Sequence, residues 1–308
     1  MYDILIVGGG EAGLSAALCA ARMNRTVAVV DRGVEASRDQ WARKYLNYPG
    51  FPDGISARAL RELGEKQAAL YGVERIRDEL ESLRESESGF VVEGRDGLYR
   101  AGAVILAYGV MDGRPEVENA ADFEGYDLHY CLLCDGYEMR GSRVAVIGNA
   151  DSAVAEAGIM TDDFGCEAMI CLDGKEPEFT EDGERQLRER SIDVRPEKIS
   201  RFVGEPRTQG GLEGLEVEGG EVLPVQHALA ALGTEVNTKL AEDLSVELDG
   251  GYVAVDARCA TNVPLVYAAG DITGGFNQAI VAAGQGAVAA IAACTDLRNN
   301  RQTAKTAT

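Results

Sequence analysis

The sequence is short of positive charge. It has 30 Lys and Arg against 51 Asp and Glu, which gives a formal net charge of −21 at pH 7. Nucleic acids and anionic membranes are bound through clustered cations, so this composition argues against both as partners. The acidic residues are spread along the chain, and such an excess destabilises a compact protein unless salt screens it. We therefore expect a halophilic protein that folds better in molar salt, with an ordinary acidic protein as the alternative.

Long hydrophobic segments are also scarce. Asp3 precedes the apolar run 4–7, which ends at once in glycines, so the start of the chain does not resemble a secretion signal. The alanine-rich stretch 278–294 is short for a membrane span and is interrupted by Gly-Gln-Gly at 284–286, which predicts a buried helix. These features predict a cytoplasmic protein with no membrane partner.

The remaining composition is that of a globular enzyme. The chain has 308 residues, of which 45% are hydrophobic, and this is enough for two domains with separate cores. It contains 37 glycines and only 8 prolines, which favours tight turns over disordered segments. Only the segment 299–308 is expected to be unstructured.

A nucleotide-binding pattern stands at the N-terminus. A short apolar strand at 3–7 is followed by Gly8-Gly-Gly10-Glu-Ala-Gly13, a helical pattern from Leu14 to about Met23, and a second strand at 26–30 that ends on Asp31. Gly8 permits the turn, Gly10 lets the backbone approach a pyrophosphate, and Gly13 lets the helix pack on the strand. Amides at the helix start favour phosphates, and Asp31 is placed to accept hydrogen bonds from a ribose.

A second copy of this pattern begins at Arg143. A strand is followed by Gly148-Asn-Ala150-Asp-Ser-Ala153, and another strand near 167–172 ends on Asp173. Near the C-terminus, a third strand from Val263 ends on Gly270-Asp271, ahead of the helix at 278–294. We therefore predict an α/β fold with two Rossmann-like FAD/NAD(P)-binding domains, the second inserted into the first. The first domain would comprise 1–112 and 236–308, and the inserted domain 113–235.

Cys131-Leu-Leu-Cys134 lies just before the second glycine turn. A zinc site would need two more ligands, and neither Cys166 with Cys171 nor His227 offers suitable spacing, so no metal site is predicted. A pair of buried core thiols is a further alternative. We favour a dithiol that opens and closes, because a C-x-x-C pair at a helix N-terminus has its thiolate stabilised by amides and the helix dipole. The other five cysteines lie in apolar surroundings and are expected to be buried, unreactive thiols: Cys19, Cys166, Cys171, Cys259 and Cys294.

The leaving thiolate of such a pair needs a proton. Asp135, directly after Cys134, is a candidate general acid if partial burial raises its pKa. An N-cap aspartate that satisfies helix amides is an equally good interpretation of this residue. His129 is a second candidate proton carrier, although a structural histidine is the simpler interpretation.

The segments VGGGEAG, CLLCDGYE, GNADSA, AAGDI and NQAIVAAGQG together resemble the low-molecular-weight thioredoxin reductases, over nearly the whole chain. The resemblance implies a homodimeric flavoprotein with FAD and a pyridine nucleotide. It also implies that Cys134 faces the flavin, Cys131 attacks the substrate disulfide and Asp135 supplies the proton. The residues that the resemblance assigns to FAD are Gly8, Gly10, Gly13, Asp31, Asn47, Gly270, Asp271, Gln278 and Ala279.

The second glycine turn departs from the family pattern. Ala150 stands where the family usually has glycine, and its methyl group would crowd a pyrophosphate. The segment after the second strand, Asp173-Gly-Lys-Glu-Pro-Glu, is net acidic and would repel the 2′-phosphate of NADPH. Asp173 suits a ribose hydroxyl, as NADH would offer. Gly148, Ala150, Ala153 and Asp173 therefore form a doubtful nucleotide site, and the choice between NADPH and NADH stays open.

Three functions fit these features. The first is a disulfide reductase that passes electrons from a donor through FAD and the cysteine pair to a thioredoxin-like protein or a small disulfide, with ferredoxin or a deazaflavin as alternative donors. The second is a dithiol oxidase that uses dioxygen, whose relatives carry His after the second Cys, where this chain has Asp135. The third is a redox-sensing FAD protein without turnover.

Overall fold

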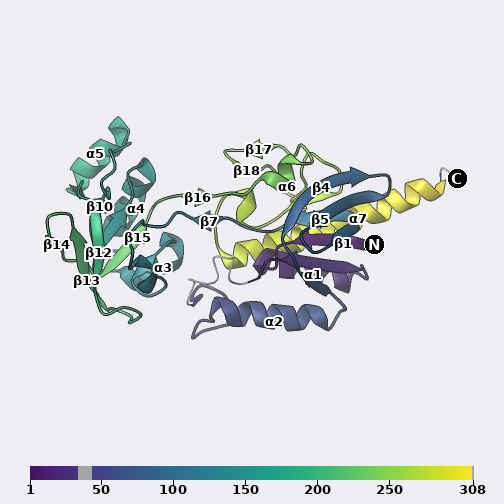
Figure 1. Cartoon of the computed structure of the whole chain (residues 1–308), viewed down its shortest axis with the longest axis horizontal. Coiled ribbons are helices and arrows are strands. Elements are labelled where there is room, and N and C mark those ends of the chain that lie inside the picture. Colours follow the sequence, from purple (N-terminus) through teal and green to yellow (C-terminus); the bar gives the residue numbers. More distant parts are fainter. Residues whose placement is uncertain (34–43, 307–308) are drawn as a thin grey trace. The chain divides into compact units, whose positions relative to one another are not determined.

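The computed structural model describes residues 1–33 and 44–306, which divide into two compact units. Of the described residues, the first unit contains 1–33, 48–111 and 236–306, and the second contains 44–47 and 112–235. The chain crosses between them in the short strands β7 (Met111–Asp112) and β16 (Thr234–Glu235), which pair with each other. Each unit is described separately (Figure 1).

The first unit is built on a seven-stranded sheet of order β3-β2-β1-β6-β5-β4, with β19 beside β6. Strands β1, β2, β3, β6 and β19 run parallel, and β4 and β5 extend the sheet as an antiparallel pair. The elements of this unit are β1 (Tyr2–Val7), α1 (Glu11–Arg22), β2 (Val27–Asp31), α2 (Ala57–Ala69), β3 (Glu74–Arg77), β4 (Leu80–Ser86), β5 (Gly89–Gly94), β6 (Leu98–Leu106), α6 (Lys239–Glu242), β17 (Leu248–Asp249), β18 (Tyr252–Val253), β19 (Val266–Ala268), the 3-10 helix η4 (Asp271–Thr273) and α7 (Ala279–Thr306).

The core of the first unit lies on both faces of this sheet. One face is covered by α1 and α7, whose small residues pack closely against each other and against alternate side chains of β1, such as Ile4 and Ile6. The other face carries Leu5 and Val7 together with apolar side chains of β6 and α6. Strands covered on both faces explain the unbroken apolar run at the N-terminus.

The second unit contains a five-stranded parallel sheet of order β11-β10-β9-β15-β8. A three-stranded antiparallel sheet of β12, β13 and β14 accompanies it. The elements are the 3-10 helix η3 (Ala120–Asp122), β8 (Leu128–His129), α3 (Leu132–Met139), β9 (Arg143–Ile147), α4 (Asp151–Asp162), β10 (Glu167–Cys171), α5 (Glu181–Arg190), β11 (Asp193–Arg195), β12 (Ile199–Gly204), β13 (Leu212–Val217), β14 (Val222–Leu223) and β15 (His227–Ala230). Both units therefore have the parallel βαβ arrangement of a Rossmann-like fold, which confirms the predicted fold class.

The C-terminal segment was predicted wrongly. Residues 299–308 are expected from their polarity to be unstructured, but α7 continues to Thr306, and Figure 1 shows this helix extending past the sheet. The segment 299–306 contains neither glycine nor proline, and lengthening an established helix fixes only one further residue for each hydrogen bond gained. Residues 307 and 308 lie outside the described part of the chain.

Candidate functional site

The first glycine turn joins β1 to α1 in the first unit. Gly8 has φ of +104°, and a Cβ there would lie 2.4 Å from the carbonyl oxygen of Ala107, so only glycine fits. A Cβ on Gly13 would lie 1.9 Å from the oxygen of Gly8, which allows the close helix–strand contact expected of this position. Gly10 is the N-cap of α1, and a Cβ there would meet no described atom within 4 Å. The turn is thus closely packed at Gly8 and Gly13 and open at Gly10, where a phosphate group has room.

Asp31 ends β2 beside this turn. Its carboxylate accepts hydrogen bonds from the amides of Gly9 and Gly33, both at 2.8 Å, and it forms an ion pair with the buried guanidinium of Arg61 from α2. Burial alone would raise the pKa of Asp31, but the Arg61 charge and the two amides outweigh it and hold the pKa below its usual value. Asp31 is therefore an ionised acceptor at the edge of the turn.

The end of β19 reaches the same place. Gly270 has φ of +82°, and a Cβ there would lie 3.0 Å from the Cβ of Ala12 in the first turn of α1. Its amide donates to the side chain of Gln285 in α7 at 2.8 Å. Asp271 begins the 3-10 helix that follows and is half-buried. The predicted residues of β1, β2 and β19 thus lie on neighbouring elements of one unit.

Helix α7 begins directly after Gln278. Gln278 and Ala279 are half-buried, and further along, Gly286 lets the helix contact α1 so closely that a Cβ would lie 2.0 Å from the oxygen of Ala12. Asn47 differs from this group, because it is exposed and clusters by its contacts with the second unit. The structure therefore does not join Asn47 to the residues around the first glycine turn.

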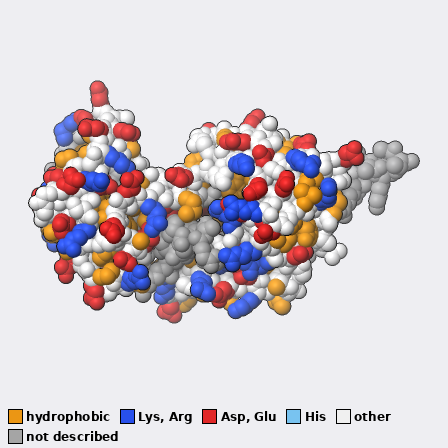
Figure 2. Space-filling model, in the orientation of Figure 1, with side chains coloured by type: hydrophobic (Ala, Val, Ile, Leu, Met, Phe, Trp, Pro, Cys, Tyr) orange, Lys and Arg blue, Asp and Glu red, His pale blue; other side chains and the backbone are white. Residues whose placement is uncertain are grey.

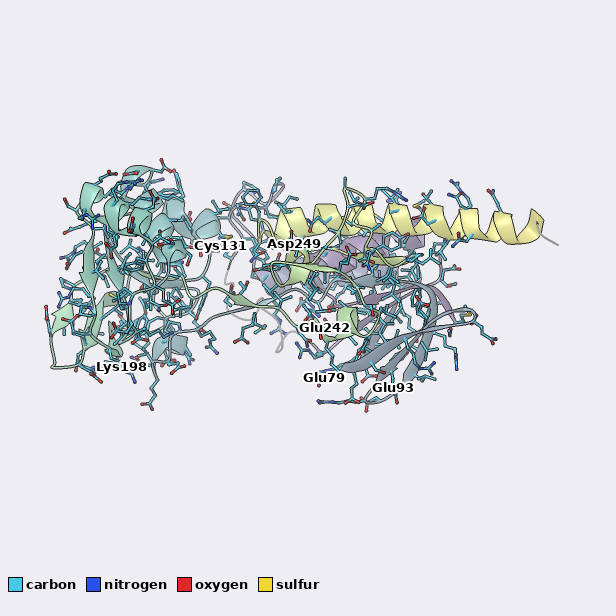
Figure 3. The ribbon with its side chains drawn as sticks, turned by 90° about the horizontal axis from the view of Figure 1, so that it is seen from above. Glu79, Glu93, Cys131, Lys198, Glu242 and Asp249 are labelled. Carbon is cyan, nitrogen blue, oxygen red and sulfur yellow. A yellow bond between two sulfur atoms is a disulfide. The ribbon has the colours of Figure 1, made fainter. Side chains whose placement is uncertain are left out.

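The cysteine pair lies in the second unit as a disulfide between Cys131 and Cys134 (Figure 3). Cys131 is the N-cap of α3, and the amides of Cys134 and Asp135 donate to its carbonyl oxygen at 3.1 and 3.0 Å. Asp135 is therefore in the first turn and is not the N-cap, so that interpretation was wrong because the helix begins earlier, at Leu132. The Oδ2 atom of Asp135 lies 3.2 Å from Nδ1 of His129.

The remaining cysteines agree with the prediction for unreactive thiols. Burial raises the pKa of each of them, which keeps them protonated. Four are buried and one is half-buried: Cys166, Cys171, Cys259 and Cys294 belong to the first group and Cys19 to the second. Over residues 1–33 and 44–306, no group of three His, Cys, Asp or Glu side chains is arranged to hold a metal ion.

His227 is a residue whose place the sequence did not reveal. It begins β15 and its Nδ1 lies 3.3 Å from Nε2 of His129 on the neighbouring strand β8. The two are 98 residues apart in the sequence. The available signal was that the chain has only 2 histidines and that one of them lies two positions before a redox cysteine.

The second glycine turn joins β9 to α4. Gly148 packs against the oxygen of Ala231 and the Cβ of Ala153, at 2.7 and 3.0 Å from its Cβ position, so strand and helix approach as in the first unit. Ala150 is the N-cap of α4 with φ of −110°, a conformation open to any residue, and it forms an isolated parallel bridge with Glu178.

A later segment of the chain is hydrogen-bonded to this second turn. The amide of Glu178 donates to the oxygen of Asn149 at 2.7 Å, and the Asn149 side chain donates to the oxygen of Glu176 at 2.9 Å. The amide of Thr180 donates to the carboxylate of Asp151 at 3.0 Å. Residues 176–180 are therefore bound along the turn, and Glu176 and Glu178 are exposed there.

Asp173 is also engaged by the chain. Its Oδ1 accepts a hydrogen bond from the amide of Ile199 at 2.8 Å, and burial raises its pKa. One carboxylate oxygen of Asp173 thus accepts a hydrogen bond within the fold, as both oxygens of Asp31 do in the first unit.

Helix α7 contains a segment, 279–300, that is long and apolar enough to cross a membrane by length and composition alone. Its inner face contacts α1, β6 and β19, and Ala289, Ala293 and Cys294 are buried there. The core helix of a soluble protein passes the same test, so this segment is weak evidence for a membrane.

Comparison with known proteins agrees with this architecture. The family model for pyridine nucleotide-disulphide oxidoreductases matches residues 2–286, and the chain belongs to that family. It is 30% identical to the thioredoxin reductase of Treponema pallidum over 96% of both chains, and 30% identical to that of Aquifex aeolicus over 95% of this chain and 92% of the other. The crystal structure of thioredoxin reductase from Streptococcus pyogenes superposes with a TM-score of 0.89 at 25% identity, covering 97% of this chain and 99% of that one.

Within the family, the chain is of the low-molecular-weight thioredoxin reductase type and is a flavin-dependent disulfide oxidoreductase.

Proposed function

We propose that the enzyme passes electrons from a donor through FAD to the Cys131–Cys134 pair, and from there to the disulfide of a thioredoxin-like protein. The observation that carries this proposal is the disulfide itself, formed across the first turn of α3 with Asp135 beside it. A thiolate at a helix N-terminus is stabilised by the free amides and the helix dipole, so the reduced pair can act as a nucleophile at neutral pH.

The residues of the first unit fit the binding of FAD. The open position at Gly10 and the amides of α1 would receive the pyrophosphate, and Asp31 would accept hydrogen bonds from the adenosine ribose. Asp271 would hold the ribityl chain, and the start of α7 at Gln278 and Ala279 would lie at the flavin ring. The bound flavin supplies the two-electron exchange with the disulfide.

The cysteines would divide the work. We assign Cys134 to the exchange with the flavin and Cys131 to the attack on the substrate disulfide. Two-electron reduction breaks the bond between the two sulfurs and leaves two thiolates. A proton can neutralise the negative charge of either one. Asp135 is the proton donor in this scheme, since it follows Cys134 directly and is partly exposed, with 35% of its side chain accessible.

We further propose that NADPH is a poor donor. Residues 176–180 bind along the second glycine turn, where the pyrophosphate of a dinucleotide would lie. The same segment places the carboxylates of Glu176 and Glu178 where the 2′-phosphate of NADPH would need cations. Reduced ferredoxin, a reduced deazaflavin or NADH would then be the donor.

The test is reduction of a thioredoxin by the anaerobic holoenzyme, measured as new protein thiols, with each donor supplied in turn. The proposal predicts thiols in the wild-type protein and none in Cys131→Ser, which keeps the flavin. A wild-type enzyme whose flavin is reduced but which yields no thioredoxin thiols would contradict it.

The second candidate function is a dithiol oxidase that passes electrons from a small dithiol to dioxygen. Like the first candidate, it would work without a nucleotide at the second glycine turn. Asp135 in place of histidine after Cys134 favours the reductase. Peroxide release on adding a small dithiol in air, in the absence of a protein partner, would favour the oxidase.

We propose a cytoplasmic homodimer. Exposed apolar side chains on α7, including Ile280, Val288 and Ile291, form a surface that a second copy of the chain would cover. A sedimentation measurement that finds only monomers at micromolar concentration would contradict the dimer.

A further inference from the structure

The only two histidines of the chain lie together in the second unit. His129 belongs to β8 and His227 to β15, two adjacent parallel strands. They are 7% and 9% exposed, and Nε2 of His129 lies 3.3 Å from Nδ1 of His227. One nitrogen of this contact carries the hydrogen and the other accepts it, so the proton of one ring fixes the tautomer of the other.

A carboxylate lies near each of the two histidines. Nδ1 of His129 lies 3.2 Å from Oδ2 of Asp135, and Nδ1 of His227 lies 3.6 Å from Oδ1 of Asp127. Asp127 is fully buried, and its two oxygens accept hydrogen bonds from the amides of Gly210 and Leu212, both at 2.9 Å. A continuous row of side chains therefore runs from a buried aspartate to the acid beside Cys134.

The same heavy-atom positions allow two arrangements of the hydrogens. When Asp135 is a carboxylate, His129 donates to it from Nδ1 and accepts at Nε2 from Nδ1 of His227, which also faces Asp127. When Asp135 is protonated, it donates to Nδ1 of His129, whose Nε2 then donates to Nδ1 of His227. The pair can therefore match both protonation states of Asp135 without moving an atom other than hydrogen.

We propose that His129 and His227 form a proton relay that returns a proton to Asp135 each time Asp135 has given one to the cysteine pair. The relay rests on the proposed function in one respect, namely that Asp135 protonates a sulfur of this pair. Asp127 places a negative charge 3.6 Å from Nδ1 of His227, which favours a hydrogen on that nitrogen.

The proton balance of one cycle is closed. Two electrons from the reductant break the bond between Cys131 and Cys134 and leave two thiolates, one of which takes the proton of Asp135. At that point both rings carry their hydrogen on Nε2, and each must lose it to water and gain one at Nδ1 from water before the relay can act. His129 then gives its Nδ1 hydrogen to the Asp135 carboxylate, and His227 gives its Nδ1 hydrogen to Nε2 of His129. Nε2 of His227 takes up one proton from water, for which the ring is sufficiently exposed at 11% of its side chain. The net change in the relay is one proton taken up and one delivered.

The surroundings keep His227 neutral. Burial, followed by the neighbouring His129, lowers the pKa of His227 to about 4, while Asp127 and Asp135 act in the opposite direction. His227 therefore carries a single ring hydrogen at neutral pH, as a relay requires. His227 on β15 pairs with the apolar residue Val144 on the neighbouring strand β9. The hydroxyl of Tyr130 donates to Glu124 at 2.6 Å, so its hydrogen is not given to either histidine.

The test uses His227→Asn in the holoenzyme. The Asn side-chain nitrogen can occupy the place of Nδ1 and donate to His129, so the hydrogen bond is kept, but an amide cannot take up one proton and release another. The rate of reduction of the Cys131–Cys134 disulfide by excess dithiothreitol is measured across neutral pH by quenching with an alkylating reagent. Dithiothreitol supplies both electrons and becomes a cyclic disulfide.

We expect the disulfide of His227→Asn to be reduced about ten- to a hundredfold more slowly than that of the wild-type protein, because general acid catalysis is worth this much or more. The deficit should grow as pH rises. Glu156→Gln is the matched control, since it removes another buried titratable group of the same unit and should leave the rate unchanged. An unchanged rate and pH profile in His227→Asn would overturn the relay. This assay needs neither an electron donor for the flavin nor thioredoxin, so failure of the proposed function would be seen separately, in the thioredoxin assay.

A second measurement uses the wild-type protein and tests the relay even if the variant does not fold. Wild-type protein labelled with ¹⁵N-histidine gives signals from two imidazoles only, whose nitrogen shifts report their tautomers. The relay predicts that the tautomer populations of both rings change together when the disulfide is reduced. Rings that each keep one fixed tautomer in both redox states would overturn it.

Discussion

The two glycine turns of this chain have the same local fold and different surroundings. In the first unit, the N-cap Gly10 faces open space and Asp31 is an ionised acceptor beside it. In the second unit, the N-cap Ala150 is bridged to Glu178, and Asp173 is bonded to the backbone of Ile199. The comparison teaches that two βαβ units with the same kind of glycine turn can differ in the chain segment that is hydrogen-bonded beside the turn.

Matching substitutions at the two N-cap residues should show the largest difference between the two turns. Gly10→Val should lose at least about tenfold in bound flavin, because the side chain fills the space left for a pyrophosphate while φ of −76° remains allowed. Ala150→Val, at the matching position of α4, should keep its flavin and its turnover. Flavin absorbance per protein checks both. A raised KM for NADPH in Ala150→Val, with flavin intact, would show that the second turn binds the nucleotide after all.

The buried ionisable groups of the two units also differ. Asp31 in the first unit is paired with Arg61, whereas in the second unit His227 is held neutral by burial. Its pKa falls from 6.5 to about 4 on folding, so the unfolded chain binds the proton more readily. Stability is therefore complete above pH 6.5 and is lost as pH falls towards 4, by up to about 3 kcal/mol. Urea titrations at several pH values should show this loss in the wild-type protein and a smaller one in His227→Gln.

Glu156 on α4 should act in the opposite pH direction. Its Oε2 is buried without a hydrogen-bond partner among the described residues, and burial raises its pKa from 4.5 to about 7. The folded state thus binds the proton more readily, and stability is lost as pH rises from 4.5 through 7, by up to about 3 kcal/mol. Glu156→Gln should be the more stable protein above pH 7 in the same urea titrations. Equal stability of the two proteins there would mean that the carboxylate finds a partner.

Salt should have the smallest effect and should act on both units. Figure 2 shows acidic and basic side chains interspersed over one face, and the formal net charge is −21. Screening of this excess predicts that the melting temperature rises when KCl is added, by roughly 2–4 °C for each kcal/mol that a domain of about 150 residues gains in stability. A melting temperature that falls with KCl would contradict the expectation of a halophilic protein.

The sequence predicted what local patterns determine. The order of strand, glycine turn, helix and acid identified both βαβ units, and the spacing of Cys131 and Cys134 identified a pair that the structure joins as a disulfide. The contact of His129 with His227 could not be predicted, because it depends on which strands lie side by side. The hydrogen bonds of residues 176–180 to the second turn depend likewise on the path of an irregular segment, for which the sequence showed only its acidity.

The central claim is that the first glycine turn serves a bound flavin and the second does not serve NADPH. It is tested most directly by the anaerobic flavin absorbance of the holoenzyme in high salt, titrated with NADPH, then NADH, then dithionite. The account predicts that the flavin is not bleached rapidly by NADPH and is bleached fully by dithionite. Rapid and complete bleaching by NADPH would show that the second turn opens to admit the nucleotide, and would contradict the account.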